Sequence, residues 1–214
     1  MRREEKRGRI VEERQKEKMN PLIQRLVQAF AKLPGVGSRT ARRAVIHMLE
    51  SGKGDSENIL RLLGEAIAKI RPCVKCGCLT EGELCFACSD AGRANGQLCL
   101  VRDLSDVIIL EKAGVFRGRY HVVGGLLSAL DGVRPEDLNL ASLAERVNSE
   151  KISEVISALP NNVDGKSTAF YIKGLLKDCC VRFSEPAQGV PIGGSLDYID
   201  DGTLAIAFSD RREI

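Results

Sequence analysis

Four of the eight cysteines fall into two close pairs that have the spacing of a metal-binding site. Cys73 and Cys76 form one Cys-x-x-Cys pair, and Cys85 and Cys88 form the second after eight intervening residues. Two such pairs can place four thiolates tetrahedrally, which is the geometry of structural Zn²⁺. Because four sulfur ligands leave no open position for water, we expect one structural zinc ion per chain and no metal-based catalysis. The alternatives are a redox pair or plain buried cysteines.

The other cysteines are expected to have no part in metal binding. Cys78 lies beside the cluster, but the paired spacing favours Cys76 as the ligand. Three more cysteines fall in expected strands and are interpreted as small core residues: Cys99, Cys179 and Cys180. Three basic residues are expected to offset part of the thiolate charge: Arg71, Lys75 and Arg93.

A second chemical feature is a glycine turn between two amphipathic segments, residues 33–38. Gly35 and Gly37 allow backbone conformations that bring the chain close to another surface. The next segment begins at Ser38, and the free N–H groups at the start of a helix are a natural phosphate site. Three arginines follow within about one turn: Arg39, Arg42 and Arg43. The pattern predicts sequence-independent DNA binding, and the alternative is a helical hairpin with a solvated basic face.

The elements that must position these residues divide the chain into helical and mixed parts. Apolar residues at helical spacing predict helices at 21–33, 38–50 and 57–70. Beyond residue 96 the pattern alternates, which is typical of an α/β domain with a mostly parallel sheet. We expect strands at 98–101, 120–123, 154–159 and 179–183. The expected helices of this part are 105–113, 135–147, 167–176 and 203–208.

Composition sets broad limits on the class of protein. The chain has 214 residues, 29% of them charged, and its net charge of +3 is too small to prove a nucleic-acid partner by itself. We find no apolar run of the roughly 20 residues that a membrane span needs. No secretory signal of the usual form is visible, so a cytoplasmic protein is expected. Residues 1–18 alternate in charge sign and are interpreted as a solvated extension.

Several motifs in a fixed order resemble one family of bacterial repair proteins. The turn and its arginines resemble the helix-hairpin-helix of DNA-repair proteins, and the four-cysteine motif and the α/β region follow it. The supporting segments are LPGVG at 33–37, YHVVGG at 120–125, LDGV at 130–133, PEDLN at 135–139, GVPIGG at 189–194 and RREI at 211–214. From about Asn20 to Ile214 the chain is similar to the RecR family of bacterial recombination mediators.

The resemblance implies an α+β multidomain architecture. Its parts are a charged extension (1–19), a helix-hairpin-helix DNA-binding region (20–72), a C4-type zinc finger (73–88), a Toprim domain (97–192) and a C-terminal oligomerisation segment (193–214). It further implies a non-enzymatic clamp that encircles DNA as a homo-oligomeric ring, either dimer or tetramer. With RecO and RecF, such a clamp helps to load the recombinase RecA at single-stranded gaps.

The same resemblance implies that the Toprim acidic site is degenerate in this chain. Toprim enzymes hold Mg²⁺ with a Glu at a strand end and a later Asp-x-Asp. Here Arg102 stands at the strand end, and the later motif contains Asp164 and Lys166, so two cations weaken Mg²⁺ binding. Asp103 and Asp106 remain as possible ligands but are equally suited to helix caps and turns. The alternative function is a Mg²⁺-dependent Toprim nuclease or strand-transfer enzyme.

Overall fold

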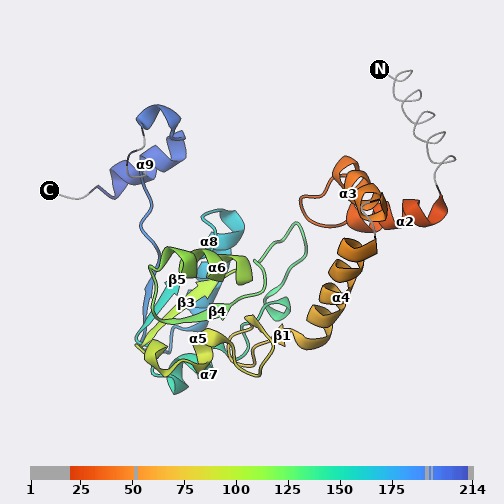
Figure 1. The fold of residues 1–214 in the computed structure, drawn as a ribbon. Coiled ribbons are helices and arrows are strands. Elements are labelled where there is room, and N and C mark those ends of the chain that lie inside the picture. Colours follow the sequence, from red (N-terminus) through yellow and green to blue (C-terminus); the bar gives the residue numbers. More distant parts are fainter. Residues whose placement is uncertain (1–19, 51–52, 191–192, 194, 212–214) are drawn as a thin grey trace. The chain divides into compact units, whose positions relative to one another are not determined.

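The structure, a computed structural model, describes residues 20–50, 53–190, 193 and 195–211 (Figure 1). The chain divides into two compact units, Met1–Lys69 and Ile70–Ile214. The extension expected at 1–19 lies outside the described residues, as do residues 191, 192 and 194 of the GVPIGG segment and residues 212–214. Among the described residues, none of the helices has both the length and the apolar character that a membrane span requires.

The first unit is built on a helical hairpin, α2 (Pro21–Phe30) and α3 (Ser38–Glu50). The Asn20 side chain accepts a hydrogen bond from the Leu22 amide, as expected of an N-cap residue. The helices pack through a small core in which Val27, Ala41 and Val45 are buried. The first helix ends at Phe30, three residues earlier than expected, because residues 31–33 fold back in turns that lead into the glycine segment.

The third helix of this unit, α4 (Lys53–Lys69), begins four residues before the expected start at 57. The apolar face that the sequence predicts is present but stays exposed. Its members are between 49% and 74% accessible: Ile59, Leu62, Leu63 and Ile67. This helix therefore contributes little to the core of its own unit.

The second unit contains a four-stranded parallel sheet in the order β4-β3-β5-β6. Its strands are β3 (Gln97–Val101), β4 (Arg119–Val122), β5 (Glu154–Ser157) and β6 (Arg182–Ser184). The intervening helices are α6 (Leu104–Ala113), α7 (Leu143–Ser149) and α8 (Val163–Leu175). The expected parallel α/β sheet is confirmed, with β3 and β5 at its centre and β4 and β6 at its edges.

Alternate residues of β3 point to two different cores, as a central strand requires. Leu98 and Leu100 pack in a cluster with residues of α7 and α8, among them Leu143 and Ile172. Cys99 and Val101 belong to a second cluster that contains Val107 of α6 and the cysteine-rich segment. The sheet is therefore covered on both faces, and the cysteine-rich segment forms part of one cover.

The cysteine-rich segment precedes the sheet and is short. It contains β1 (Arg71–Pro72) paired antiparallel with β2 (Leu79–Thr80), followed by α5 (Phe86–Ser89) and the 3-10 turn η1 (Ala91–Arg93). At the other end of this unit, the 3-10 turn η3 (Leu196–Tyr198) leads to α9 (Asp201–Ser209). The side chain of Asp200 caps α9 by accepting a hydrogen bond from the Thr203 amide.

Two predictions for the secondary structure of the sheet unit were wrong. Residues 135–147 form a 3-10 turn, η2 (Pro135–Asp137), and the separate helix α7. The helix cannot run through because Leu138 is extended and Asn139 donates its amide to the Val123 carbonyl. The last strand begins at Arg182, so Cys179 and Cys180 are not strand residues. Cys180 is exposed and Cys179 is half-buried.

Candidate metal centre and nucleic-acid interface

The structure brings the four paired cysteines together. The sulfur atoms of Cys73, Cys76, Cys85 and Cys88 all lie within 4.8 Å of one another, and all four residues are buried. The first pair comes from the turn between β1 and β2, where Gly77 has a φ of +77° that favours glycine. In the second pair, Cys85 is the N-cap residue of α5 and Cys88 is the third residue of that helix.

This sulfur geometry fits a tetrahedral metal ion. Zinc–sulfur bonds of about 2.3 Å give sulfur–sulfur distances of roughly 3.8 Å in a tetrahedron. The Cys76 and Cys85 sulfurs lie 3.4 Å apart and share a hydrogen bond. That bond raises the pKa of Cys76 and lowers the pKa of Cys85, since one proton serves both sulfurs. A divalent cation would replace this shared proton and stabilise all four thiolates.

Cys78 lies next to the cluster without joining it. Its thiol is buried and points to the Leu79 carbonyl oxygen, 3.9 Å away. Burial raises the pKa of Cys78 to about 11, so this thiol stays protonated at neutral pH. The geometry therefore separates Cys78 from the four candidate ligands.

The cation that contacts the cluster is one that sequence reasoning missed. Arg146 of α7 donates from Nη2 to the Cys88 sulfur over 3.6 Å, although 58 residues separate them in the chain. Arg93, which was expected to offset thiolate charge, instead binds Glu111 at 2.6 Å and lies over the Phe86 ring. Nothing in the local sequence around α7 indicates the Arg146 contact, because only the fold brings it to the cysteines.

The turn between α2 and α3 matches the expected glycine geometry in part. Gly35 has a φ of +76°, which an L-residue adopts only with strain, and a Cβ built there would meet nothing within 4 Å. Gly37 has no such backbone requirement, and its carbonyl accepts the Ala41 amide as the first bond of α3. Ser38 is the first residue of α3, as the sequence predicts.

Three exposed arginines follow this turn. Arg39, Arg42 and Arg43 lie in the first half of α3, whose first turn has no acidic residue. Within the part of the chain that the structure describes, none of the three forms an ion pair. Their guanidinium groups and the N–H groups at the start of α3 are thus available to an anion.

The residues expected to form the degenerate acidic site follow the carboxyl ends of β3 and β5 but do not form a carboxylate cluster: Arg102, Asp103, Asp106, Asp164 and Lys166. Asp103 caps α6 by accepting the Ser105 amide, and its other oxygen binds Arg102 Nε at 2.9 Å. Asp106 accepts the Arg102 backbone amide at 2.9 Å. Among the described residues, the four cysteines are the one group of acidic, histidine or cysteine side chains close enough to hold a metal ion.

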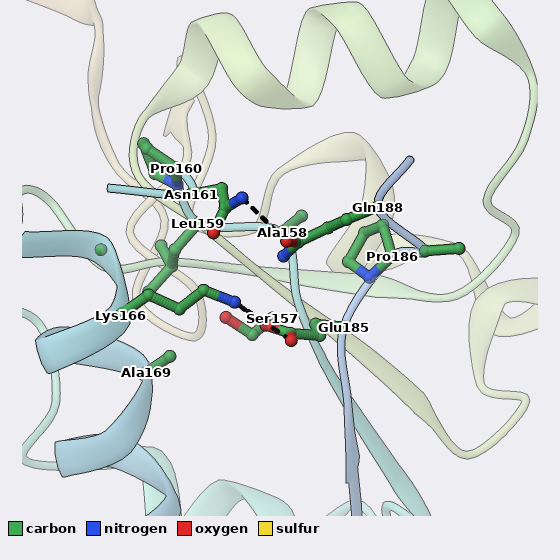
Figure 2. Close-up of a pocket in the computed structure, with 12 residues that line it drawn as sticks. Ser157, Ala158, Leu159, Pro160, Asn161, Lys166, Ala169, Glu185, Pro186 and Gln188 are labelled. Atoms are coloured by element: carbon green, nitrogen blue, oxygen red, sulfur yellow. Dashed lines mark hydrogen bonds and ion pairs between the residues drawn. The ribbon is translucent and has the colours of Figure 1, made fainter. Parts of the chain in front are cut away.

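The other two residues of this set lie at the start of α8. Asp164 is in the first turn of that helix, and Lys166 Nζ forms an ion pair with Glu185 at 2.8 Å. Figure 2 shows this pair and the Asn161–Gln188 hydrogen bond in a cavity of about 170 Å³ beyond β5 and β6. The cavity is therefore bridged by its own side chains and lacks the paired carboxylates that hold Mg²⁺ in a phosphoryl-transfer site.

His121 is a buried residue of the sheet with two defined hydrogen-bond partners. His121 lies in β4, is fully buried, and its Nε2 is 2.6 Å from the Asn139 carbonyl oxygen. Since a carbonyl only accepts, Nε2 carries the proton and Nδ1 accepts from Arg146 Nη1 at 3.3 Å. Burial lowers the pKa of His121 to about 4, so the ring is neutral and structural. His47 lies on α3 and is exposed.

Comparison with known families matches three consecutive parts of the chain. A RecR helix-hairpin-helix model matches residues 23–67, a Toprim domain model matches 96–184, and a RecR C-terminal model matches 189–212. Together with the hairpin and the sheet described above, these matches define a multidomain helix-hairpin-helix and Toprim protein.

Whole-chain similarity narrows this class to one family. The Recombination protein RecR of Cereibacter sphaeroides (strain ATCC 17029) is 51% identical over 190 residues, which cover 89% of this chain and 96% of that protein. That of Maricaulis maris is 48% identical over 198 residues (91% and 96%), and that of Rhodospirillum rubrum is 47% identical over 192 residues (90% and 98%). The chain belongs to the RecR family.

Proposed function

We propose that this protein is a non-enzymatic, DNA-binding mediator of recombinational repair. It acts as a homo-oligomeric ring, a dimer or tetramer, that holds DNA and works with RecO and RecF to load RecA at single-stranded gaps. The observation that carries this proposal is the set of exposed arginines on α3, which form no ion pair with any residue that the structure describes, in a chain of the RecR family. The RecR helix-hairpin-helix match covers this same region.

The proposed DNA contact is electrostatic and does not read sequence. Gly35 lets the turn approach a phosphate closely, and the amides at the start of α3 donate to its oxygens. Arg39, Arg42 and Arg43 then supply full charges next to those amides. Such contacts bind the backbone of any DNA, which suits a protein that acts wherever a gap occurs.

The proposed metal is one structural Zn²⁺ at the four buried cysteines. The donor set of four thiolates favours zinc among the common cellular ions, and four ligands leave no site for a reacting water. The metal would hold a segment whose own secondary structure is limited to two short strands, a four-residue helix and one 3-10 turn. Substituting Cys76→Ser should abolish the metal content of purified protein, whereas Cys78→Ser should leave one ion per chain.

The carboxyl edge of the sheet supports the non-enzymatic function over a Mg²⁺-dependent nuclease. Asp103 and Asp106 are engaged in capping and backbone contacts around Arg102, and Lys166 is paired with Glu185. Incubation with plasmid and Mg²⁺ or Mn²⁺ should therefore leave the DNA intact. Nicking that Asp164→Ala removes would establish the alternative enzyme.

The DNA contact is tested by the salt dependence of affinity. The Arg39→Ala/Arg43→Ala variant should bind more weakly, and its slope of log affinity against log salt should fall by about 1.8 on duplex or about 1.4 on single-stranded DNA. The matched control is Arg61→Ala/Lys69→Ala, which also removes two charges from this unit, both held by Glu65 on α4. Equal slopes for the two variants would remove the arginines of α3 from the interface.

A further inference from the structure

Arg146 contacts the cysteine cluster from outside the set of four candidate ligands. The Arg146 side chain is only 4% exposed, so its guanidinium sits in the interior with little water to compensate its charge. Four thiolates around a divalent ion carry two more negative charges than the ion neutralises. The Arg146 Nη2 donor, 3.6 Å from the Cys88 sulfur, faces that excess directly.

The rest of the guanidinium group is held on the sheet. Nη1 donates to the Tyr120 carbonyl oxygen of β4 at 2.8 Å, and Nε binds Glu150 at 3.2 Å. Glu150 is itself fixed by a second, half-buried arginine, Arg119, at 2.9 Å. Because Arg146 is anchored by Tyr120 of β4 and by Glu150 at the end of α7, its position relative to Cys88 is set by the sheet unit and not by the cysteine segment.

A second connection runs through the backbone of a ligand residue. The Cys76 carbonyl oxygen accepts the Val122 amide of β4 at 2.8 Å. β4 is an edge strand, so the backbone N–H groups on its open side have no neighbouring strand to bind. Where another segment covers that side, these N–H groups need hydrogen-bond acceptors from it. The approach is close, since a Cβ on Gly77 would come within 2.7 Å of the Asn139 side chain, which itself donates to the Val122 carbonyl. A metal that fixes Cys76 therefore also fixes the edge of the sheet.

We infer that Arg146 is a positioning residue for the metal. Through Arg146 and the Cys76–Val122 hydrogen bond, metal binding and the ordering of strand β4 occur together, as one cooperative event. This inference rests on the proposed zinc at the four cysteines. Outer-shell donors to metal ligands typically change metal affinity by about 10- to 100-fold. Loss of the metal should release β4 before it releases the central strand β5.

The first test measures metal retention in full-length protein. Zinc loss to a competing chelator should be about 10- to 100-fold more favourable in Arg146→Gln than in the wild type. In cobalt-loaded protein, the thiolate-to-cobalt charge-transfer band should shift in this variant. Arg146→Lys keeps the positive charge and should recover part of the affinity. The matched control is Arg119→Gln, which removes the other partner of Glu150 and has no contact with a cysteine.

The control separates a general loss of stability from a direct effect on the metal. Both variants are expected to unfold at lower temperature, but Arg119→Gln should keep its chelator resistance and its cobalt spectrum. Equal metal retention in the Arg146→Gln and Arg119→Gln variants would overturn the inference. A wild-type protein that binds no metal at all would instead refute the proposed zinc site itself.

A measurement on the wild type keeps the inference testable if Arg146→Gln does not fold. Amide hydrogen exchange is compared in the zinc-loaded and chelator-treated protein. The Val122 amide should exchange at least about tenfold faster without metal, while amides of β5 keep their protection. Unchanged protection at Val122 after metal removal would show that the β4 edge does not depend on the metal.

Discussion

The buried His121 predicts a specific loss of stability in mild acid. Burial lowers its pKa to about 4, and the nearby Arg146 charge acts in the same direction. In the unfolded chain the imidazole has its ordinary pKa of about 6.5. Between pH 4 and pH 6.5 the imidazole is protonated in the unfolded state but neutral in the native state. The stability contributed by neutral His121 is therefore complete above about pH 6.5 and is lost as pH falls towards 4.

The size of the effect follows from the same two pKa values. Linkage gives a loss of about 2 kcal/mol between pH 7 and pH 5 and about 3 kcal/mol by pH 4. The variant that isolates it is His121→Gln, because glutamine can donate to the Asn139 carbonyl and accept from Arg146 but does not titrate. Its unfolding free energy should therefore fall by about 2 kcal/mol less than that of the wild type over this range.

The assay is urea unfolding at pH 7 and pH 5 with zinc in excess, and with metal content measured at both values. All other titratable groups are the same in both proteins, so only the difference between the two reports His121. An identical pH dependence in wild type and His121→Gln would show that His121 takes up a proton in the native state as readily as in the unfolded chain, so its burial would cost no stability in acid.

Two further predictions concern glycines. Gly165→Ala should destabilise the sheet unit by well over about 1 kcal/mol, because a Cβ there would overlap the Pro160 carbonyl oxygen, whereas Gly64→Ala in α4 meets nothing and should stabilise by about 0.5–1 kcal/mol. Thermal unfolding compares them, and equal effects would contradict the packing at Gly165. Gly35→Ala should cost about 1–2 kcal/mol through its positive φ and weaken DNA binding. An unchanged melting temperature and affinity would show that the turn does not need the left-handed conformation.

Much of the fold was accessible from the sequence because local signals agree with one another. Asn20 and Pro21 mark the start of α2, and short apolar runs mark β3 and β5. The prediction of one helix at 135–147 was wrong because a long-range hydrogen bond, from the Asn139 amide to the Val123 carbonyl oxygen, outweighs the local helical propensity. Such a bond depends on where β4 lies, which no local pattern reveals.

The candidate site was predictable to a similar degree. The Cys-x-x-Cys spacing indicates the same four cysteines that lie together in the structure, and Cys78 lies outside that group. The charge partner was not predictable, since Arg146 reaches Cys88 only after α7 packs on the sheet. Arg93 is close to the cysteines in sequence, yet a better partner, Glu111, holds it elsewhere.

The most direct measurement is the molar mass of zinc-loaded protein, by light scattering, with and without gapped DNA at low ionic strength. For an oligomeric DNA clamp we expect several chains of 23.3 kDa to join the DNA in one complex of defined mass. If folded, metal-loaded protein left the mass of gapped DNA unchanged, the protein would not be a DNA clamp.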